Sequence, residues 1–232
     1  IDNLEHGSLT NTDFDPQKRT DHCPPNSMVR TGMASATSDT ARAVIRDMVS
    51  KGVGMTSTLA VYEPFFPRRD VSDARTLEAM SPEVRQAYLQ IRTHIDTNTA
   101  WPYTPEMLRN AMAFEKAFVE AGGLLAAGVD PTGFGGALPG YGDQRNYELL
   151  TEAGFTPAQT VQIMSANGAR ILGVYQTLGS VEGGKIADLV VLRGDLASDP
   201  SVIRNVVTVF KDGVGYDSAK LIAAVKGRVG ID

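Results

Sequence analysis

Short apolar runs alternate with more polar segments over the first 173 residues of the chain. Three of these runs predict buried β-strands, at residues 1–5, 53–61 and 124–129. Helices are expected in the segments that follow them, at residues 39–51, 81–96, 104–121 and 156–173. Strands that alternate with helices indicate parallel strands joined by crossover helices. The pattern therefore predicts an α/β fold.

Capping residues set the limits of these helices. A Ser or Thr followed by proline is typical of a helix start, because proline suits the first helical position. This pair occurs three times, at Ser81-Pro82, Thr104-Pro105 and Thr156-Pro157. Asp39 is predicted to cap the first helix, and Gly52 follows its end. Polar and glycine-rich loops are expected at residues 8–36 and 131–145.

The pattern changes near residue 174. Short β-rich runs joined by turns follow at residues 186–192 and 206–210, and an amphipathic helix is expected at residues 218–226. We therefore predict two units, residues 1–173 and residues 174–232.

Composition narrows the possible partners. The chain has 232 residues, 42% of them hydrophobic, and a net charge of −5, so we expect no nucleic-acid partner. No apolar run reaches the roughly 20 residues that cross a bilayer, so no membrane partner is expected. Cys23 is the only cysteine, which suits a reducing compartment and favours the cytoplasm. A periplasmic or secreted location stays open if a signal lies upstream.

The first residue lies inside an apparent strand motif. No initiator methionine precedes Ile1, and a natural gene product rarely begins inside a strand motif. We therefore expect a fragment, a processed product or a sequence that lacks its first half.

Two good metal ligands stand where apolar strands are expected to end. His6 precedes Gly7, and Asp130 precedes Pro131. In parallel barrels, catalytic groups gather at the carboxyl ends of the strands, and a divalent metal there takes imidazole and carboxylate ligands. Each residue also has a structural reading, since His6 can be merely terminal and Asp130 can cap its loop.

Other polar residues have weaker patterns. Tyr62 and Glu63 follow the second strand and are candidates to contact substrate, although such a pair is also common in loops. His22 and Cys23 fit no zinc spacing and are expected in a surface loop, and His94 is expected to be structural near a helix end. The glycine-rich stretch 133–140 lacks the spacing of a phosphate loop, which favours a mobile loop.

In this order, the motifs resemble the amidohydrolase superfamily, especially the imidazolonepropionase-like branch with its metal-dependent prolidases. The resemblance rests on Asp2-x-Leu4-Glu5-His6-Gly7, on Ala127-Gly128-Val129-Asp130 and on residues 179–192. It implies strands six to eight of a TIM-like (β/α)8 barrel, plus part of a small flanking β-sandwich.

The resemblance also implies a chemistry. Asp130 and His6 would be catalytic and would bind zinc or another divalent metal, with one or two ions in a complete enzyme. The reaction would be hydrolysis of a C–N bond in a small-molecule amide, dipeptide or cyclic amide. The family's His-x-His motif, bridging residue and fifth-strand histidine are missing. A missing N-terminal half, a second chain or a homo-oligomer is therefore expected. The alternative is a non-catalytic scaffold without a complete metal site.

Overall fold

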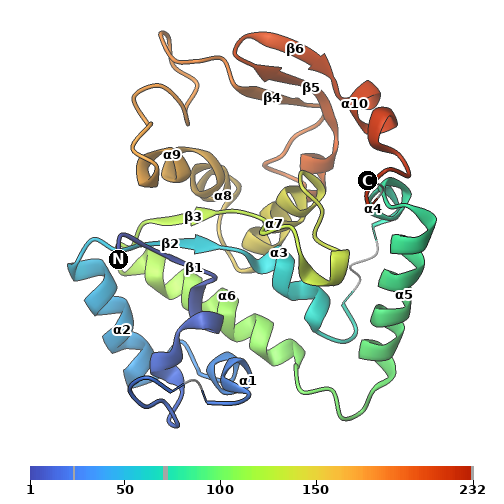
Figure 1. Cartoon of the computed structure of the whole chain (residues 1–232). Helices are drawn as coiled ribbons and strands as arrows, with labels where there is room; N and C mark the ends of the chain where they lie inside the picture. Colours follow the sequence, from blue (N-terminus) through green and yellow to red (C-terminus); the bar gives the residue numbers. More distant parts are fainter. Residues whose placement is uncertain (23, 70–72, 231–232) are drawn as a thin grey trace.

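A three-stranded parallel sheet lies at the centre of the larger part of the molecule. The computed structural model describes residues 1–22, 24–69 and 73–230. The strands are β1 (Asn3–Glu5), β2 (Gly54–Ser57) and β3 (Leu125–Ala127), in the order β1-β2-β3 (Figure 1). Both pairings are parallel, which confirms the predicted parallel α/β arrangement.

Helices connect and flank these strands. Those of the first two connections are α1 (Ser27–Gly32), α2 (Asp39–Ser50), α3 (Leu59–Tyr62), α4 (Ala74–Ala79), α5 (Pro82–Thr97) and α6 (Pro105–Glu120). The helices that follow β3 are α7 (Tyr141–Glu152), α8 (Pro157–Gln162) and α9 (Gly168–Ile171). A π-helical turn at Ile163–Asn167 lies between α8 and α9. Single 3-10 turns occupy Gly7–Thr10, Thr12–Phe14, Glu63–Phe65, Gly133–Gly135 and Pro200–Arg204. In the described part of the chain, no helix has both the length and the apolar character needed to cross a bilayer.

The main core lies between the sheet and helix α6. Met55 in β2 and Leu125 in β3 are fully buried and are direct cross-strand partners. Helix α6 presents Met107, Phe114 and Phe118 to this core, and all three side chains are at most 1% exposed. Burial of side chains of this size stabilises the fold by about 1.5–3 kcal/mol each. Figure 1 shows α2 and α6 below the sheet.

A second, antiparallel sheet follows in the last part of the chain. It consists of β4 (Leu189–Leu192), β5 (Val206–Lys211) and β6 (Val214–Asp217), and α10 (Ser218–Val225) packs against β5 and β6. Figure 1 shows this sheet at the end of the molecule opposite α2 and α6. The predicted β-rich runs and final helix are confirmed, whereas β6 was not predicted.

Several predicted boundaries are wrong for identifiable reasons. The strand expected at 53–61 ends at Ser57, because the next residues turn into α3. The loop expected at 8–36 contains α1 and two 3-10 turns. Ser38 rather than Asp39 caps α2, since its side chain accepts the N–H of Ala41. The loop expected at 131–145 ends where α7 begins at Tyr141.

One further helix differs from the sequence-based expectation, and two agree with it. The helix expected at 156–173 is interrupted by the π-helical turn. The helices expected at 81–96 and 104–121 are confirmed to within one residue at each end. Cys23, and with it part of the expected surface loop, lies outside the described residues.

Candidate functional site

His6 lies directly after β1, in a backbone conformation that is unusual for histidine. Its φ of 70° is left-handed, which costs free energy in any residue with a Cβ. Its N–H donates to the carbonyl oxygen of Thr56, 3.2 Å away, and its Nδ1 lies 2.9 Å from Oγ1 of Thr58. The second contact occupies one ring nitrogen and fixes the plane of the imidazole. Nε2 is thereby left to face another group.

Asp130 supplies that group. It follows β3 by three residues, also has a left-handed φ, of 44°, and places Oδ2 3.6 Å from Nε2 of His6. The His6 and Asp130 side chains are 29% and 41% exposed, so the pair lies at the surface of the described chain. The two side chains therefore lie close together just beyond the carboxyl ends of β1 and β3, as predicted, while their catalytic and metal-binding roles stay predictions.

Tyr62 forms a wall beside this pair. Its ring meets the ring of His6 edge to face, with centroids 5.8 Å apart. Burial, and secondarily the negative charge of Asp130, raise the pKa of Tyr62 to about 12. The phenol therefore stays protonated at neutral pH.

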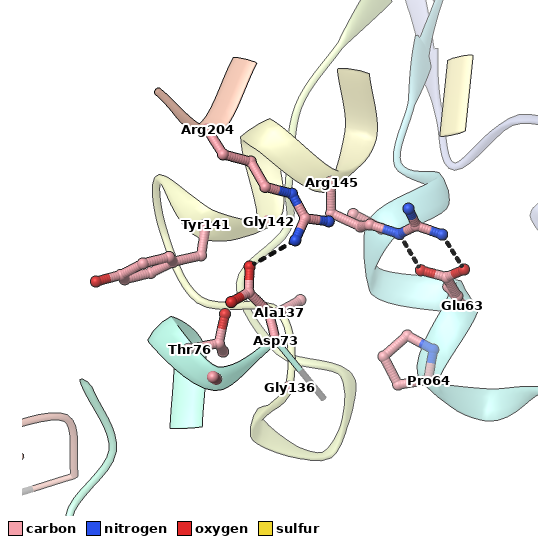
Figure 2. A pocket seen from close by; sticks show the side chains of 12 residues that line it. Glu63, Pro64, Asp73, Thr76, Gly136, Ala137, Tyr141, Gly142, Arg145 and Arg204 are labelled. Atoms are coloured by element: carbon pink, nitrogen blue, oxygen red, sulfur yellow. Dashed lines mark hydrogen bonds and ion pairs between the residues drawn. The ribbon is translucent and has the colours of Figure 1, made fainter. Parts of the chain in front are cut away.

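Glu63 has a different environment. Its carboxylate is 1% exposed, and it accepts hydrogen bonds from Arg69 at 2.7 Å and from two nitrogens of Arg145, each at 2.7 Å. Figure 2 shows Glu63 and Arg145 pointing toward each other in a pocket of about 300 Å³ that Asp73 and Arg204 also line. His6, Asp130 and Tyr62 do not line that pocket. Substrate contact by Glu63 stays a prediction.

The geometry of His6 and Asp130 fits two ligands of one metal ion. Two donors with bonds of about 2.0–2.2 Å and a tetrahedral angle lie about 3.4 Å apart, close to the 3.6 Å between Nε2 and Oδ2. A metal-binding histidine usually engages its other ring nitrogen with a polar partner, and Thr58 provides one here. Within residues 1–22, 24–69 and 73–230, no group of three or more His, Cys, Asp or Glu residues could hold a metal. The role of the two residues as metal ligands therefore stays a prediction, and a site built on them would need further ligands.

The other two histidines lie in other elements. His94 is in the last turn of α5, where its ring packs edge to face on Trp101 at 5.9 Å, as expected for a structural role. His22 forms an isolated bridge with Arg19 in the polar segment before α1.

Two groups near the mouth were not found from the sequence. Thr58 belongs to no recognisable motif, and its hydroxyl reaches His6 only because the chain turns into α3. Glu115 belongs to α6, where an acidic residue on a helix suggests solvent, yet it is fully buried with its carboxyl near Gly7 and Ser57. Burial raises the pKa of Glu115 to about 8, and the nearby hydroxyl of Ser57 opposes this shift.

Comparisons with known proteins point to one family. Residues 141–215 match the model of the amidohydrolase family. A Xaa-Pro dipeptidase solved with bound methionine is 21% identical at a TM-score of 0.51, and the match covers 83% of this chain and 42% of the dipeptidase. Bottromycin amidohydrolase is 16% identical at a TM-score of 0.60, and the match covers 97% of this chain and 49% of that protein.

A third similar structure is A. niger ochratoxinase, 17% identical at a TM-score of 0.50, covering 83% of this chain and 39% of the ochratoxinase. No curated protein sequence matches the chain. The chain thus shares its fold with proteins of which it spans less than half the length. Together, the match at residues 141–215 and the shared fold confirm that this chain resembles the amidohydrolase superfamily.

Proposed function

We propose that the chain is part of a metal-dependent hydrolase that cleaves a C–N bond in an amide, dipeptide or cyclic amide. One observation carries this proposal: Nε2 of His6 faces Oδ2 of Asp130 at 3.6 Å, while Thr58 holds Nδ1. The names of the similar structures, a Xaa-Pro dipeptidase and an amidohydrolase, support the class of bond. The substrate would be a small molecule that enters at the carboxyl ends of the strands.

The proposal includes the architecture around this pair. We infer that residues 1–173 form the C-terminal part of a (β/α)8 barrel, with β1, β2 and β3 as strands six to eight. Residues 174–232 would belong to a flanking β-sandwich. A missing N-terminal half, a second chain or another copy would supply the remaining strands and ligands. The incomplete ligand set and the share of each similar structure that is covered support this inference.

The roles of the described side chains follow from their geometry. A bound zinc or other divalent ion, one or two per complete site, would supply a Lewis acid that makes water acidic near neutral pH. Asp130 would accept a proton from the attacking water and return it to the leaving amine. His6 would be held for ligation by Thr58, or would donate to the substrate carbonyl in a one-ion site. Protonated Tyr62 would border the substrate.

A non-catalytic scaffold is the alternative, and one observation favours it. The described residues hold two convergent ligands, and zinc sites usually have three or more from protein. Under this alternative, no polypeptide that contains the segment retains metal. Metal content therefore separates the two proposals.

Replacing Asp130 tests the catalytic role directly. In the longest polypeptide that contains this segment, Asp130→Asn should lower kcat for amide or dipeptide hydrolysis by about 10²–10⁴, because an amide accepts no proton. The matched control is Asp39→Asn, whose side chain is fully exposed at the start of α2. Circular dichroism of both variants should match the parent. A kcat within about threefold of the parent's for Asp130→Asn would show that Asp130 only caps its loop.

A further inference from the structure

A continuous row of aromatic rings leads away from the His6 and Asp130 pair. The row begins at Tyr62, which contacts His6, and continues to Phe65 at a centroid distance of 6.3 Å. Phe65 in turn packs against Phe134 at 4.6 Å. All of these separations fall within the range of favourable aromatic pairs. The three rings of Tyr62, Phe65 and Phe134, which we call the aromatic wall, therefore form one apolar surface that starts at the candidate reaction centre.

One half-buried and one buried donor hold the backbone of this wall. Nε1 of Trp101 donates to the carbonyl oxygen of Phe65 at 2.7 Å. The guanidinium of Arg92, a residue that is 4% exposed, donates to the carbonyl oxygen of Pro64 and at 3.4 Å to that of Phe66. Consecutive carbonyls of the turn are thus fixed by groups from α5 and the loop after it. Such support is typical of a preformed binding surface rather than of a loose loop.

Phe134 brings the third ring to the wall from the loop that also carries Asp130. It is 39% exposed and has a left-handed φ of 58°, a conformation that costs a bulky residue free energy. His6 and Asp130 have left-handed φ angles as well, so three of the seven described non-glycine residues of this kind lie at one mouth. Strained backbone of this kind clusters at functional sites.

We propose that the aromatic wall is a specificity subsite that receives an aromatic side chain of the substrate, next to the C–N bond. This rests on the proposed function. The occupant is identified by chemistry and position, because a flat apolar group would stack on Phe134 and Phe65 while its amide reaches His6 and Asp130. A substrate that has a hydrogen atom in place of this aromatic side chain would lose the contact. Burial of a phenyl-sized side chain corresponds to a preference of about 10- to 100-fold.

Binding of two small amides to the 232-residue chain tests the proposal. The probes are N-acetyl-L-phenylalanine amide and N-acetylglycine amide, titrated by NMR without added metal. The phenylalanine probe should bind at least about tenfold more tightly, and saturation transfer should reach its ring protons. Phe134→Ala should remove most of this preference and leave binding of the glycine probe unchanged. Phe134→Leu, which keeps apolar area, should retain part of it, and Val190→Ala on the exposed second sheet should retain it all.

Each outcome decides the proposal. Equal affinities for the two probes, no binding of either up to about 10 mM, or a preference that survives Phe134→Ala would overturn it. If the circular dichroism of Phe134→Ala shows that this variant is misfolded, the preference measured with Phe134→Leu decides instead. A partial loss of the preference in Phe134→Leu would then support the aromatic wall, and an unchanged preference would overturn it. If the 232-residue chain shows the preference for the phenylalanine probe but no longer polypeptide that contains the segment retains metal, the aromatic wall is supported while the proposed hydrolase fails. Metal-dependent hydrolysis without the preference would refute only the aromatic wall.

Discussion

At the scale of single residues, one buried carboxylate holds the turn that presents Tyr62 and Phe65. Glu63 lies between these two residues in sequence, and Arg69 and Arg145 bind its carboxylate from two sides. Arg69 also pairs with Glu152, and Arg145 is itself bound by Glu148, so the carboxylate belongs to a wider ion-pair network. Removing one partner from a buried ion pair leaves the other charges uncompensated, which is costly.

Glu63→Gln should therefore destabilise the chain. We expect the free energy of unfolding to fall by about 3 kcal/mol, the low end for breaking a buried pair, because both arginines retain some solvent contact. Urea denaturation at one fixed protein concentration measures this change. Asp39→Asn removes a carboxylate from a solvent-exposed pair and should change the same quantity by less than about 0.5 kcal/mol. Equal effects of the two substitutions would contradict the anchoring role of Glu63.

The sequence predicts the meeting of His6 and Asp130 because the carboxyl ends of parallel strands share one edge. It does not predict Thr58 or Phe134 as neighbours of that mouth. Thr58 reaches His6 only because the backbone turns into α3 one residue later. Phe134 reaches Phe65 only through a left-handed residue in a loop, and local propensity disfavours that conformation for phenylalanine.

At the scale of elements, the contact between α6 and the parallel sheet contains a titratable group. Glu115 is fully buried on α6 beside Ser57 of β2, and its Oε2 has no hydrogen-bond partner among the described residues. A charge there would be expensive, and burial accordingly raises the pKa of Glu115 to about 8. The carboxyl is therefore mostly protonated at neutral pH in the folded chain and ionised in the unfolded chain.

Glu115 should make stability depend on pH in a defined direction. Because the folded state keeps a proton that the unfolded state releases, the free energy of unfolding falls as pH rises from about 5 to about 8. The contribution of this one group is about 1.4 kcal/mol per pH unit and levels off above that window. Glu115→Gln, which cannot ionise, should lack this contribution. Urea unfolding of parent and variant at several pH values checks it, and parallel pH profiles would contradict it.

Helices with a Ser-Pro or Thr-Pro start are predictable because the signal is local, and both α5 and α6 begin where it occurs. The strand predicted at 53–61 is too long because apolar residues from Leu59 onward suit a buried helix as well as a buried strand. Strand β6 escapes prediction because all four of its residues are exposed, so no apolar pattern announces it.

At the scale of the whole molecule, two small sheets leave much apolar surface open. β1 and β3 are the two edges of the described parallel sheet, and such edges favour pairing with another chain. On the second sheet, Val190, Val191 and Val214 are each more than 40% exposed. The sequence indicates that partner strands are missing, because the metal-ligand motifs of the earlier barrel strands are absent from it. How much apolar surface is exposed can be known only from the packed structure.

We therefore expect the purified 232-residue chain to associate with itself or with a complementary chain. Burial of the open edges and exposed valines would provide the driving force. Sedimentation velocity across a range of concentrations measures the oligomeric state. A monomer that stays monomeric at all concentrations and unfolds cooperatively would show that these surfaces need no partner.

The central claim is that His6 and Asp130 are ligands of one metal centre, and metal content tests it most directly. The 232-residue chain alone should hold zinc weakly, because the part of it that the structure describes provides two convergent ligands. The longest polypeptide that contains the segment should retain metal through gel filtration, and its His6→Ala, Asp130→Asn double variant should lose at least one ion per chain. A His22→Ala, His94→Ala control should keep the full complement. Equal metal content in the parent and in the His6, Asp130 double variant would contradict the claim.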